Sequence, residues 1–283
     1  MKTHRNHDKL SNMNLQLDGK KVLVTGSSKG IGEAIARKFA SENAVVIVHG
    51  RNHAQSEKVA NDIVAQGGKA FFVTGDLTDD QQVQRLVEEA EKLAGTIDIL
   101  VNNAGGSGDA KVGWSETQTA PWTYTYDRNV LAAVRVITRL LPKMQQGKWG
   151  RVINISSIAA IVPPPSSPDY SASKSAMNAM TVSMAKAVAA DGVTVNAVSP
   201  GTIRSSKLES RFREAAAERG LMNHDAPWED IEREVLPLFA QVPVGRVGHL
   251  DDIANAVVFL ASPLAGYISG INLRVDGAMS SSL

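Results

Sequence analysis

The sequence predicts an α/β fold, a doubly wound parallel sheet in a three-layer α/β/α arrangement that forms a single domain. Three observations support this prediction. Short apolar runs alternate along the chain with amphipathic stretches at helical spacing, which is typical of a parallel sheet covered on both faces. No linker or low-complexity tract interrupts the alternation. The 283 residues, 43% of them hydrophobic, suffice for one substantial core, and parallel α/β folds commonly reach this size undivided.

The first half of the chain alternates strand and helix three times. Each strand is a short apolar run, and the first helix shows Ile31, Ile35 and Phe39 at helical spacing. Two glycines end the second helix, and the third carries the charge pattern of a surface helix. The predicted elements are strand 22–24, a helix through 31–39, strand 45–48, helix 54–66, strand 71–73 and helix 79–94.

The second half continues with a long helix and four more strands. Ligands of a parallel sheet bind beyond the carboxyl ends of its strands. This rule places Gly26, Asp76, Asn103, Ser157 and Pro200 at one edge of the molecule. The predicted elements are strand 97–101, helix 122–146, strand 152–155, strand 194–198, a helix beginning near Leu250 and strand 271–275.

Composition argues against several classes of function. Thirty basic and twenty-nine acidic residues give a formal charge of +1, so no broad field is available to hold nucleic acid or an anionic membrane. The absence of cysteine excludes disulfides and thiolate chemistry and fits a cytoplasmic location. No metal site is predicted. Residues 1–14 are polar, unlike a signal peptide or membrane anchor, and we expect 1–16 to form a flexible N-terminal arm ahead of a domain over 17–283.

Tyr170 and Lys174 form the strongest chemical clue in the chain. On a helix, positions i and i+4 project from nearly the same side, so the ammonium can lie near the phenol and favour its ionised form. A phenol, with an ordinary pKa of about 10, needs such help to exchange protons near neutral pH. Taken alone, the spacing also fits a surface tyrosine and a solvated lysine.

A glycine-rich turn lies between the first strand and the first helix. Glycines at 26, 30 and 32 have the spacing G-x-x-x-G-x-G. Glycine lets the backbone adopt positive φ and approach a ligand closely, while the amides at a helix N-terminus receive a pyrophosphate. Glycine is also common in ordinary loops, but this position in an α/β pattern favours nucleotide binding.

Together these motifs resemble the short-chain dehydrogenase/reductase family, in its β-ketoacyl reductase-like branch, over about residues 17–278. The resemblance implies a Rossmann-like fold, a nicotinamide cofactor and reversible hydride transfer between a ketone and a secondary alcohol. The matching segments, in the family's order, are Thr25-Gly26-x-x-x-Gly30-x-Gly32, Asn102-Asn103-Ala104-Gly105, Asn129, Ser157, Tyr170-x-x-x-Lys174 and Pro200-Gly201.

The resemblance also implies roles for four catalytic residues. Ser157 would donate a hydrogen bond to the substrate carbonyl, and Tyr170 would supply the proton. Lys174 would bind the nicotinamide ribose and lower the phenol pKa, and Asn129 would hold a water in a proton relay to the lysine. Ser156 competes for the serine role, although the spacing to Tyr170 favours Ser157. A buried structural amide is the alternative for Asn129.

Residues after the second strand bear on cofactor choice. No carboxylate stands there to accept the adenine ribose hydroxyls, and Arg51 can instead pair with a 2′-phosphate. Lys29 in the glycine turn adds a second charge. The sequence therefore favours NADP(H) over NAD(H), the alternative being that both cations are merely solvated. His49 is assigned to packing or to the surface.

Further cofactor contacts are implied by the resemblance. Asp76 and Leu77 would contact the adenine, although Asp76 also fits a loop cap, and Ile203 would contact the nicotinamide. Asn103 is also expected to join adjacent strands. The full predicted cofactor set is Gly26, Ser28, Lys29, Gly30, Ile31, Gly32, Arg51, Asp76, Leu77, Asn103, Ala104, Gly105, Tyr170, Lys174, Pro200, Gly201, Ile203 and Ser205.

Substrate recognition is the least determined part of the reading. Residues 206–241 form a charged, helix-prone insertion that the resemblance identifies as a substrate lid. We expect it to close over the pocket together with the loop 158–169 and segment 106–114. Trp114, Trp122 and Trp228 either line an apolar pocket or simply pack. Arg204 or Arg211 would meet a substrate carboxylate, unless each is solvated. The expected partner is a small ketone or alcohol, and the expected assembly is a homotetramer.

Two other classes of function compete with the oxidoreductase. A catalytically silent nucleotide-binding redox sensor would typically lack the tyrosine or the lysine, yet both are present. A lyase or epimerase on the same scaffold would often alter the glycine turn or the lysine, and neither is altered. Within the oxidoreductases, the motifs do not separate β-ketoacyl thioesters from small or cyclic ketones, nor do they fix the direction.

Overall fold

The computed structural model describes residues 14–108 and 114–280. Its described part forms one parallel sheet of seven strands in the order β3-β2-β1-β4-β5-β6-β7. The chain winds outward from β1 in one direction and from β4 in the other, so the crossover lies between these two strands. The strands are β1 Lys21–Val24, β2 Val45–Gly50, β3 Lys69–Thr74, β4 Ile99–Asn102, β5 Gly150–Ile155, β6 Val193–Pro200 and β7 Asn272–Val275.

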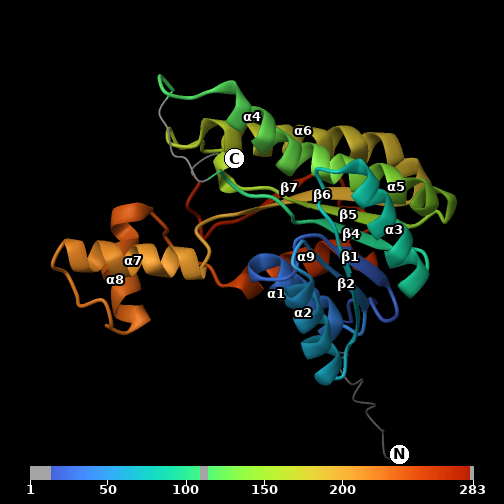
Figure 1. Ribbon diagram of the computed structural model, residues 1–283, viewed down its shortest axis with the longest axis horizontal. Coiled ribbons are helices and arrows are strands. Elements are labelled where there is room, and N and C mark those ends of the chain that lie inside the picture. Colours follow the sequence, from blue (N-terminus) through green and yellow to red (C-terminus); the bar gives the residue numbers. More distant parts are fainter. Residues whose placement is uncertain (1–13, 109–113, 281–283) are drawn as a thin grey trace, which may run out of the picture.

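Helices cover both faces of the sheet, so the predicted three-layer fold is confirmed (Figure 1). One face is covered by α1 Gly30–Ser41, α2 His53–Ala65 and α9 Leu250–Ala261. The other is covered by α3 Asp80–Ala94, α4 Thr119–Tyr126, α5 Ala132–Gln146 and α6 Pro168–Val188. The helices α7 Ser206–Glu218 and α8 Trp228–Phe239 project together from one end of the sheet.

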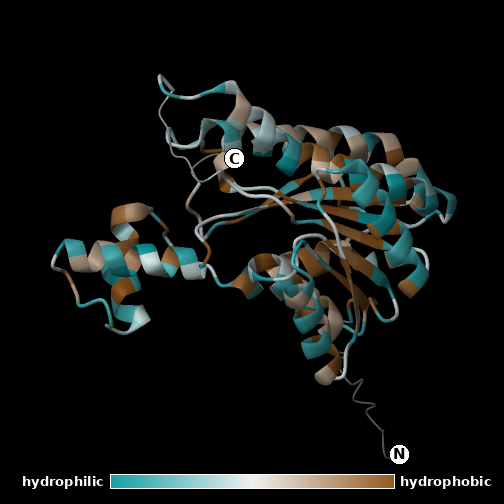
Figure 2. Ribbon diagram, in the orientation of Figure 1, coloured by the Kyte–Doolittle hydropathy of each residue, from teal (hydrophilic) through white to brown (hydrophobic). Residues whose placement is uncertain are grey.

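The two faces of the sheet bury separate apolar cores. In β1, Val22 and Val24 face the core under α1 and α9, while Leu23 faces the core under α3 and α5. This alternation follows from the two-residue period of a strand. Because both faces are buried, the strands are almost continuously apolar, and Figure 2 shows them as hydrophobic bands between more hydrophilic helices.

The predicted helix over 122–146 differs from the observed one. A π-helical turn, Asp127–Leu131, separates α4 from α5. Such a turn inserts one residue into the helical repeat, and such turns frequently occur at functional sites. Its buried residue Asn129 hydrogen-bonds the backbone of Gly106, so the turn faces the loop after β4.

The chain is anchored to the core before residue 17. Residues 1–13 of the predicted arm lie outside the described residues, but 14–16 are described. Leu15 packs against the core, and its carbonyl accepts a hydrogen bond from Ser262 Oγ at 2.8 Å. No helix in the described ranges is long and apolar enough to cross a membrane.

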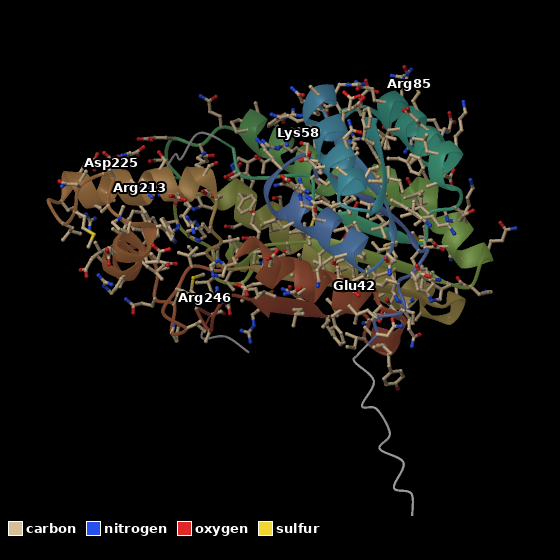
Figure 3. All side chains as sticks on the ribbon, turned by 90° about the horizontal axis from the view of Figure 1, so that it is seen from below. Glu42, Lys58, Arg85, Arg213, Asp225 and Arg246 are labelled. Atoms are coloured by element: carbon tan, nitrogen blue, oxygen red, sulfur yellow. The ribbon has the colours of Figure 1, made fainter. Side chains whose placement is uncertain are left out.

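The predicted insertion 206–241 contains α7 and α8, which share a small core of their own. Arg213, labelled on this unit in Figure 3, donates to the carbonyls of His224 and Ala226, each at 2.9 Å, and so fixes the connection between the helices. The buried residues of this core are Phe212, Ala216, Trp228, Ile231, Val235, Leu236 and Val247.

Candidate active site

Two cavities open at the carboxyl edge of the sheet. The larger, of about 710 Å³, lies between the glycine turn and α6, and Ser157, Tyr170 and Lys174 are on its wall. The smaller, of about 260 Å³, lies beyond β2 and β3 and is lined by Arg51 and Asp76. The two cavities share Gly26, Lys29, Asn103 and Gly105 in their linings, and every residue of the predicted cofactor set lines one or both of them.

The glycine turn has no room for side chains at two of its positions. Gly26 adopts φ +64°, and a Cβ on it would lie 2.9 Å from the Cα of Ala104. A Cβ on Gly32 would collide with the Gly26 carbonyl oxygen and lie 2.5 Å from Asn103 Nδ2. The turn therefore needs glycine there because neighbouring backbone passes directly against it.

The turn is held to the loop after β4 by two side chains. Asn103 Nδ2 donates to the carbonyls of Thr25 and Gly26 at 2.9 and 3.0 Å. Thr25 Oγ1 accepts the backbone N–H groups of Asn103 and Ala104, each at 3.0 Å. The amide of Asn103 thus joins neighbouring strands, as the sequence suggested.

Lys174 is buried beside the end of β5. Its side-chain ammonium donates to the carbonyl of Ile155 at 2.7 Å, and the residue is 3% exposed. Burial, followed by the nearby charge of Arg128, lowers the Lys174 pKa to about 8. Its Nζ lies 5.9 Å from the centre of the Tyr170 ring.

The phenol of Tyr170 remains protonated near neutral pH. Burial raises its pKa above the ordinary value, while a hydrogen bond with Ser157 and the charge of Arg128 act in the opposite direction. The net direction is therefore opposite to the expected lowering of the phenol pKa, because burial outweighs the hydrogen bond with Ser157 and the charge of Arg128. A protonated phenol is the form that can donate a proton to a carbonyl oxygen.

The two serines after β5 point to different partners. Ser156 Oγ donates to the backbone carbonyl of Lys174 at 3.3 Å and is buried. Ser157 Oγ accepts the amide of Ala159 at 3.1 Å and interacts with the Tyr170 hydroxyl. The geometry favours Ser157 over Ser156 for a role beside the tyrosine.

Asn129 is not on the wall of either cavity. Its Oδ1 accepts the amide of Gly106 at 2.8 Å, and its Nδ2 donates to the Gly106 carbonyl at 3.2 Å and to Ser173 Oγ at 2.9 Å. No hydrogen bond joins it to Lys174 within the described part of the chain. These contacts favour the structural alternative, in which its amide holds the loop after β4.

His49 has a positioning role that the sequence analysis missed. Its Nδ1 accepts the Gly26 amide at 3.1 Å, so Nε2 must carry the proton, which it donates to the Gly75 carbonyl at 3.1 Å. Burial lowers its pKa to about 4, so the ring is neutral at neutral pH. One imidazole thus joins the loops after β1 and β3. The sequence signal that could have revealed this role is a histidine directly before the glycine that ends β2.

We expect His49→Leu to lower stability and nucleotide affinity together. The substitution leaves the half-buried Gly26 amide without its acceptor, which costs up to about 1–3 kcal/mol. Urea unfolding and nucleotide titration measure the two effects. His49→Asn keeps an acceptor near Nδ1 and should retain more affinity than His49→Gln, whose amide reaches toward Gly75. Equal affinity in all three variants would contradict this role.

Asp76 and Arg51 lie beside each other on the wall of the smaller cavity. Arg51 Nη1 lies 4.0 Å from Asp76 Oδ2, and the arginine side chain is 72% exposed. Asp76 Oδ1 accepts from the amide and hydroxyl of Thr78, at 2.9 and 2.8 Å, and the Thr78 amide is the largest cause of its lowered pKa. Asp76 therefore caps its loop, and Arg51 stays accessible to a ligand.

The predicted substrate-side aromatic residues do not line these two cavities. Trp228 is buried in the α7–α8 core, where it stacks on Phe212 at 5.7 Å. Trp114 contacts Trp122 at 5.6 Å. Trp228 therefore packs in this structure, as the sequence analysis allowed, whereas Trp114 stays 67% exposed. Residues 109–113 of the predicted segment 106–114 lie outside the described residues.

The two arginines considered for a substrate carboxylate have other contacts. Arg204 lines the larger cavity but pairs with Glu209 at 3.2 Å. The Arg211 guanidinium lies over the ring of Phe239, 5.7 Å from its centre. Among the described side chains, no group of three or more His, Asp or Glu residues could hold a metal ion.

Comparison with known families decides the classification. The family described as short chain dehydrogenase matches residues 20–216, and that described as Enoyl-(Acyl carrier protein) reductase matches 230–280. The chain is a short-chain dehydrogenase/reductase. It is therefore an oxidoreductase that acts on CH–OH or C=O groups, with a Rossmann-like fold.

Relatives of this short-chain dehydrogenase span several substrates. It is 34% identical to a 3-oxoacyl-[acyl-carrier-protein] reductase of Aquifex aeolicus over 275 residues, which is 94% of the chain and 100% of the relative. It is 33% identical to 7alpha-hydroxysteroid dehydrogenase of Escherichia coli over 264 residues, covering 93% and 95%. The β-ketoacyl reductase-like resemblance is confirmed.

Two solved structures of the family also superimpose on the chain. L-Sorbose reductase from Gluconobacter frateurii, complexed with NADPH and L-sorbose, aligns with a TM-score of 0.87 at 31% identity, covering 96% of this chain and 100% of that one. 7 Alpha-hydroxysteroid dehydrogenase, complexed with NADH, aligns with a TM-score of 0.79 at 30% identity, covering 95% and 98%. The two relatives hold different nucleotides, so likeness alone does not select one.

Proposed function

We propose that the protein is an NADP-dependent reductase of a ketone, or in reverse a dehydrogenase of a secondary alcohol, with Tyr170 as the proton donor. The observation that supports this most directly is one cavity wall shared by the glycine turn and by Ser157, Tyr170 and Lys174. The cradle leaves room for a nucleotide, because Gly30 lines this cavity and a Cβ on it would meet no protein atom within 4 Å.

The residues of the chain divide the chemistry among them. Ser157 donates a hydrogen bond to the substrate carbonyl oxygen and orients it toward Tyr170. The phenol transfers its proton to that oxygen and takes a proton back from solvent after the product alcohol leaves. Lys174, held by the Ile155 carbonyl, carries the ammonium that we assign to the ribose hydroxyls. The bound nicotinamide supplies the hydride to the carbonyl carbon.

Cofactor preference follows from the end of β2, where an arginine replaces a carboxylate. We expect Arg51→Ala to weaken NADPH binding about tenfold to a hundredfold, because a charge-assisted bond to the 2′-phosphate is lost. NADH, which lacks that phosphate, should bind as before. Titration of each nucleotide measures the effect, and an unchanged preference would show that Arg51 does not select the cofactor.

The substrate class is proposed only as a small ketone or secondary alcohol. The names of the relatives given above refer to an acyl thioester, a steroid and a sugar as substrates. No described contact in the cavity favours one of these three classes of substrate. A panel of a 3-oxoacyl thioester, a steroid ketone and a ketose, with NADPH and NADH, tests the activity at the nicotinamide absorbance band. No turnover with any ketone, despite nucleotide binding, would favour the redox sensor. Turnover without nicotinamide oxidation would favour a lyase or epimerase.

Three further points stay predictions. We propose that α7 and α8 act as the substrate lid of a single domain over 17–283. We also propose a homotetramer, which the exposed apolar residues around a hollow of about 940 Å³ between α4, α5 and α6 support. Tyr124, Tyr126 and Leu131 belong to this face. We also propose a cytoplasmic location, on the ground of the cysteine-free sequence.

A further inference from the structure

The continuous helix α4–α5, with its π turn, presents one face to the smaller cavity. Tyr124, Arg128 and Ala132 are spaced by four residues and all line that cavity, as do Ser28 and Lys29 of the glycine turn. The Arg128 guanidinium also reaches the loop after β4, since a Cβ on Gly106 would lie 3.0 Å from Arg128 Nη2. Arg128 therefore lies at the junction between the loop and the cavity.

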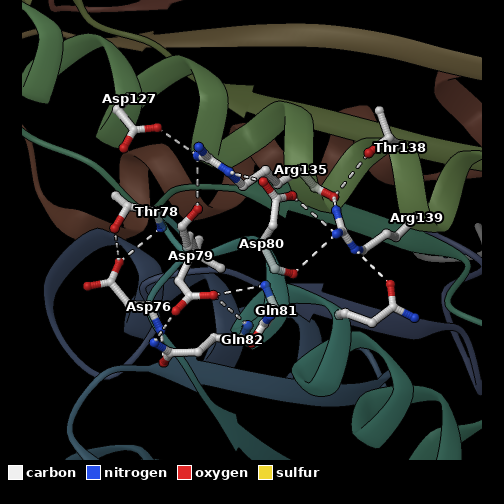
Figure 4. Close-up of polar contacts among 12 residues, drawn as sticks. Asp76, Thr78, Asp79, Asp80, Gln81, Gln82, Asp127, Arg135, Thr138 and Arg139 are labelled. Carbon is white, nitrogen blue, oxygen red and sulfur yellow. Dashed lines mark hydrogen bonds and ion pairs between the residues drawn. The ribbon is translucent and has the colours of Figure 1, made fainter.

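Among the described residues, Arg128 differs from the other arginines of this helix in having no acidic partner. Figure 4 shows Arg135 between Asp127 and Asp80, at 2.7 and 3.3 Å, and Arg139 beside Asp80. The nearest acid in sequence, Asp127, is thus paired with Arg135. Across residues 14–108 and 114–280, no hydrogen bond or ion pair reaches Arg128, which contacts the Tyr124 ring at 5.8 Å.

The charge around the smaller cavity is unbalanced. Of the described residues, Lys29, Arg51 and Arg128 line it, against the single carboxylate of Asp76, which lies beside Arg51. A half-buried cation without a partner is costly unless a ligand neutralises it. The charge of Arg128 also acts on Tyr170 and Lys174, so this cation lies close to the reacting centre.

We propose that Arg128 binds the pyrophosphate of the nicotinamide nucleotide, from the side of the cavity opposite the glycine turn. This inference rests on the proposed function, which supplies the nucleotide. Arg51 at the end of β2 accounts for the 2′-phosphate, so the pyrophosphate is the remaining anionic group of the ligand. A guanidinium suits it because its planar fork matches two phosphate oxygens.

The test separates the pyrophosphate from the 2′-phosphate by titrating the full-length protein with four ligands. ADP-ribose carries the pyrophosphate, adenosine 2′-monophosphate carries the 2′-phosphate, and NADPH and NADH complete the set. We expect Arg128→Met to weaken the binding of ADP-ribose, NADPH and NADH about tenfold to a hundredfold. The affinity for adenosine 2′-monophosphate should stay unchanged. Arg128→Lys should lose less affinity for these ligands. Arg139→Met, a matched change on the same helix, should alter the affinity for none of the four ligands. Thermal unfolding verifies that each variant folds.

Different failures have different meanings. If ADP-ribose bound equally well to wild type and Arg128→Met, the inference would be overturned while the proposed function stood. The same holds if only adenosine 2′-monophosphate weakened, or if only the KM for the ketone rose, because Arg128 would then contact the 2′-phosphate or a substrate anion. A wild-type protein that bound none of the four ligands would overturn both proposals.

Discussion

Tyr170→Phe is expected to lower kcat by about 10²–10⁴-fold while leaving the dissociation constant for NADPH nearly unchanged. The substitution keeps the ring and removes the hydroxyl that we assign as proton donor. Because burial raises the phenol pKa, the wild-type group is protonated at neutral pH, which is the form needed in the reductive direction. Steady-state reduction of an active ketone, with a separate nucleotide titration, measures both quantities.

A matched tyrosine on the surface serves as control. Tyr267 is fully exposed and lines neither of the two cavities. Tyr267→Phe should leave kcat, KM and nucleotide affinity at wild-type values. Nearly full turnover in Tyr170→Phe would remove the tyrosine from the chemistry and leave the proton donor unassigned. A loss of nucleotide affinity alone would instead make Tyr170 a binding residue.

The second large effect is expected at the glycine turn. Gly32→Ala should abolish measurable nucleotide binding and lower the free energy of unfolding by about 1–3 kcal/mol, the usual cost of overpacking. The reason is steric, because the new methyl group would meet the Gly26 carbonyl and Asn103 Nδ2. Moving Asn103 would also release its hydrogen bonds to Thr25 and Gly26. Urea unfolding and NADPH titration measure the two changes.

Gly30→Ala separates crowding from backbone strain in the same turn. Gly30 has φ +60°, but a Cβ there would meet no atom within 4 Å. Its cost should therefore be only the strain of a left-handed residue, about 1–2 kcal/mol. We expect this variant to keep much of its nucleotide affinity. If Gly32→Ala bound NADPH as tightly as Gly30→Ala, close approach of the backbone would not be what the turn requires.

The strands and most helices could be predicted because burial on both faces leaves a continuous apolar signal. The π turn could not, since a single inserted residue hardly disturbs helical periodicity. The predicted cofactor residues lie together because parallel strands bring their carboxyl ends to one edge. The direction of the Tyr170 pKa was missed because depth of burial is a tertiary property. His49 and Arg128 were missed because their partners, Gly26, Gly75 and the cavity, lie far away in sequence.

The separate core shared by α7 and α8 has an evolutionary consequence. Phe212 and Trp228 stack within that unit, so its apolar core is distinct from the two cores that flank the sheet. The groups proposed for redox chemistry lie on α6 and on loops of the sheet instead. Substitutions in α7 and α8 beyond Ser206 and Lys207, which line the larger cavity, can therefore change the projecting pair while the residues proposed for catalysis stay the same. Variation in this unit therefore offers a way for relatives to change substrate specificity while the chemistry of the reaction stays the same.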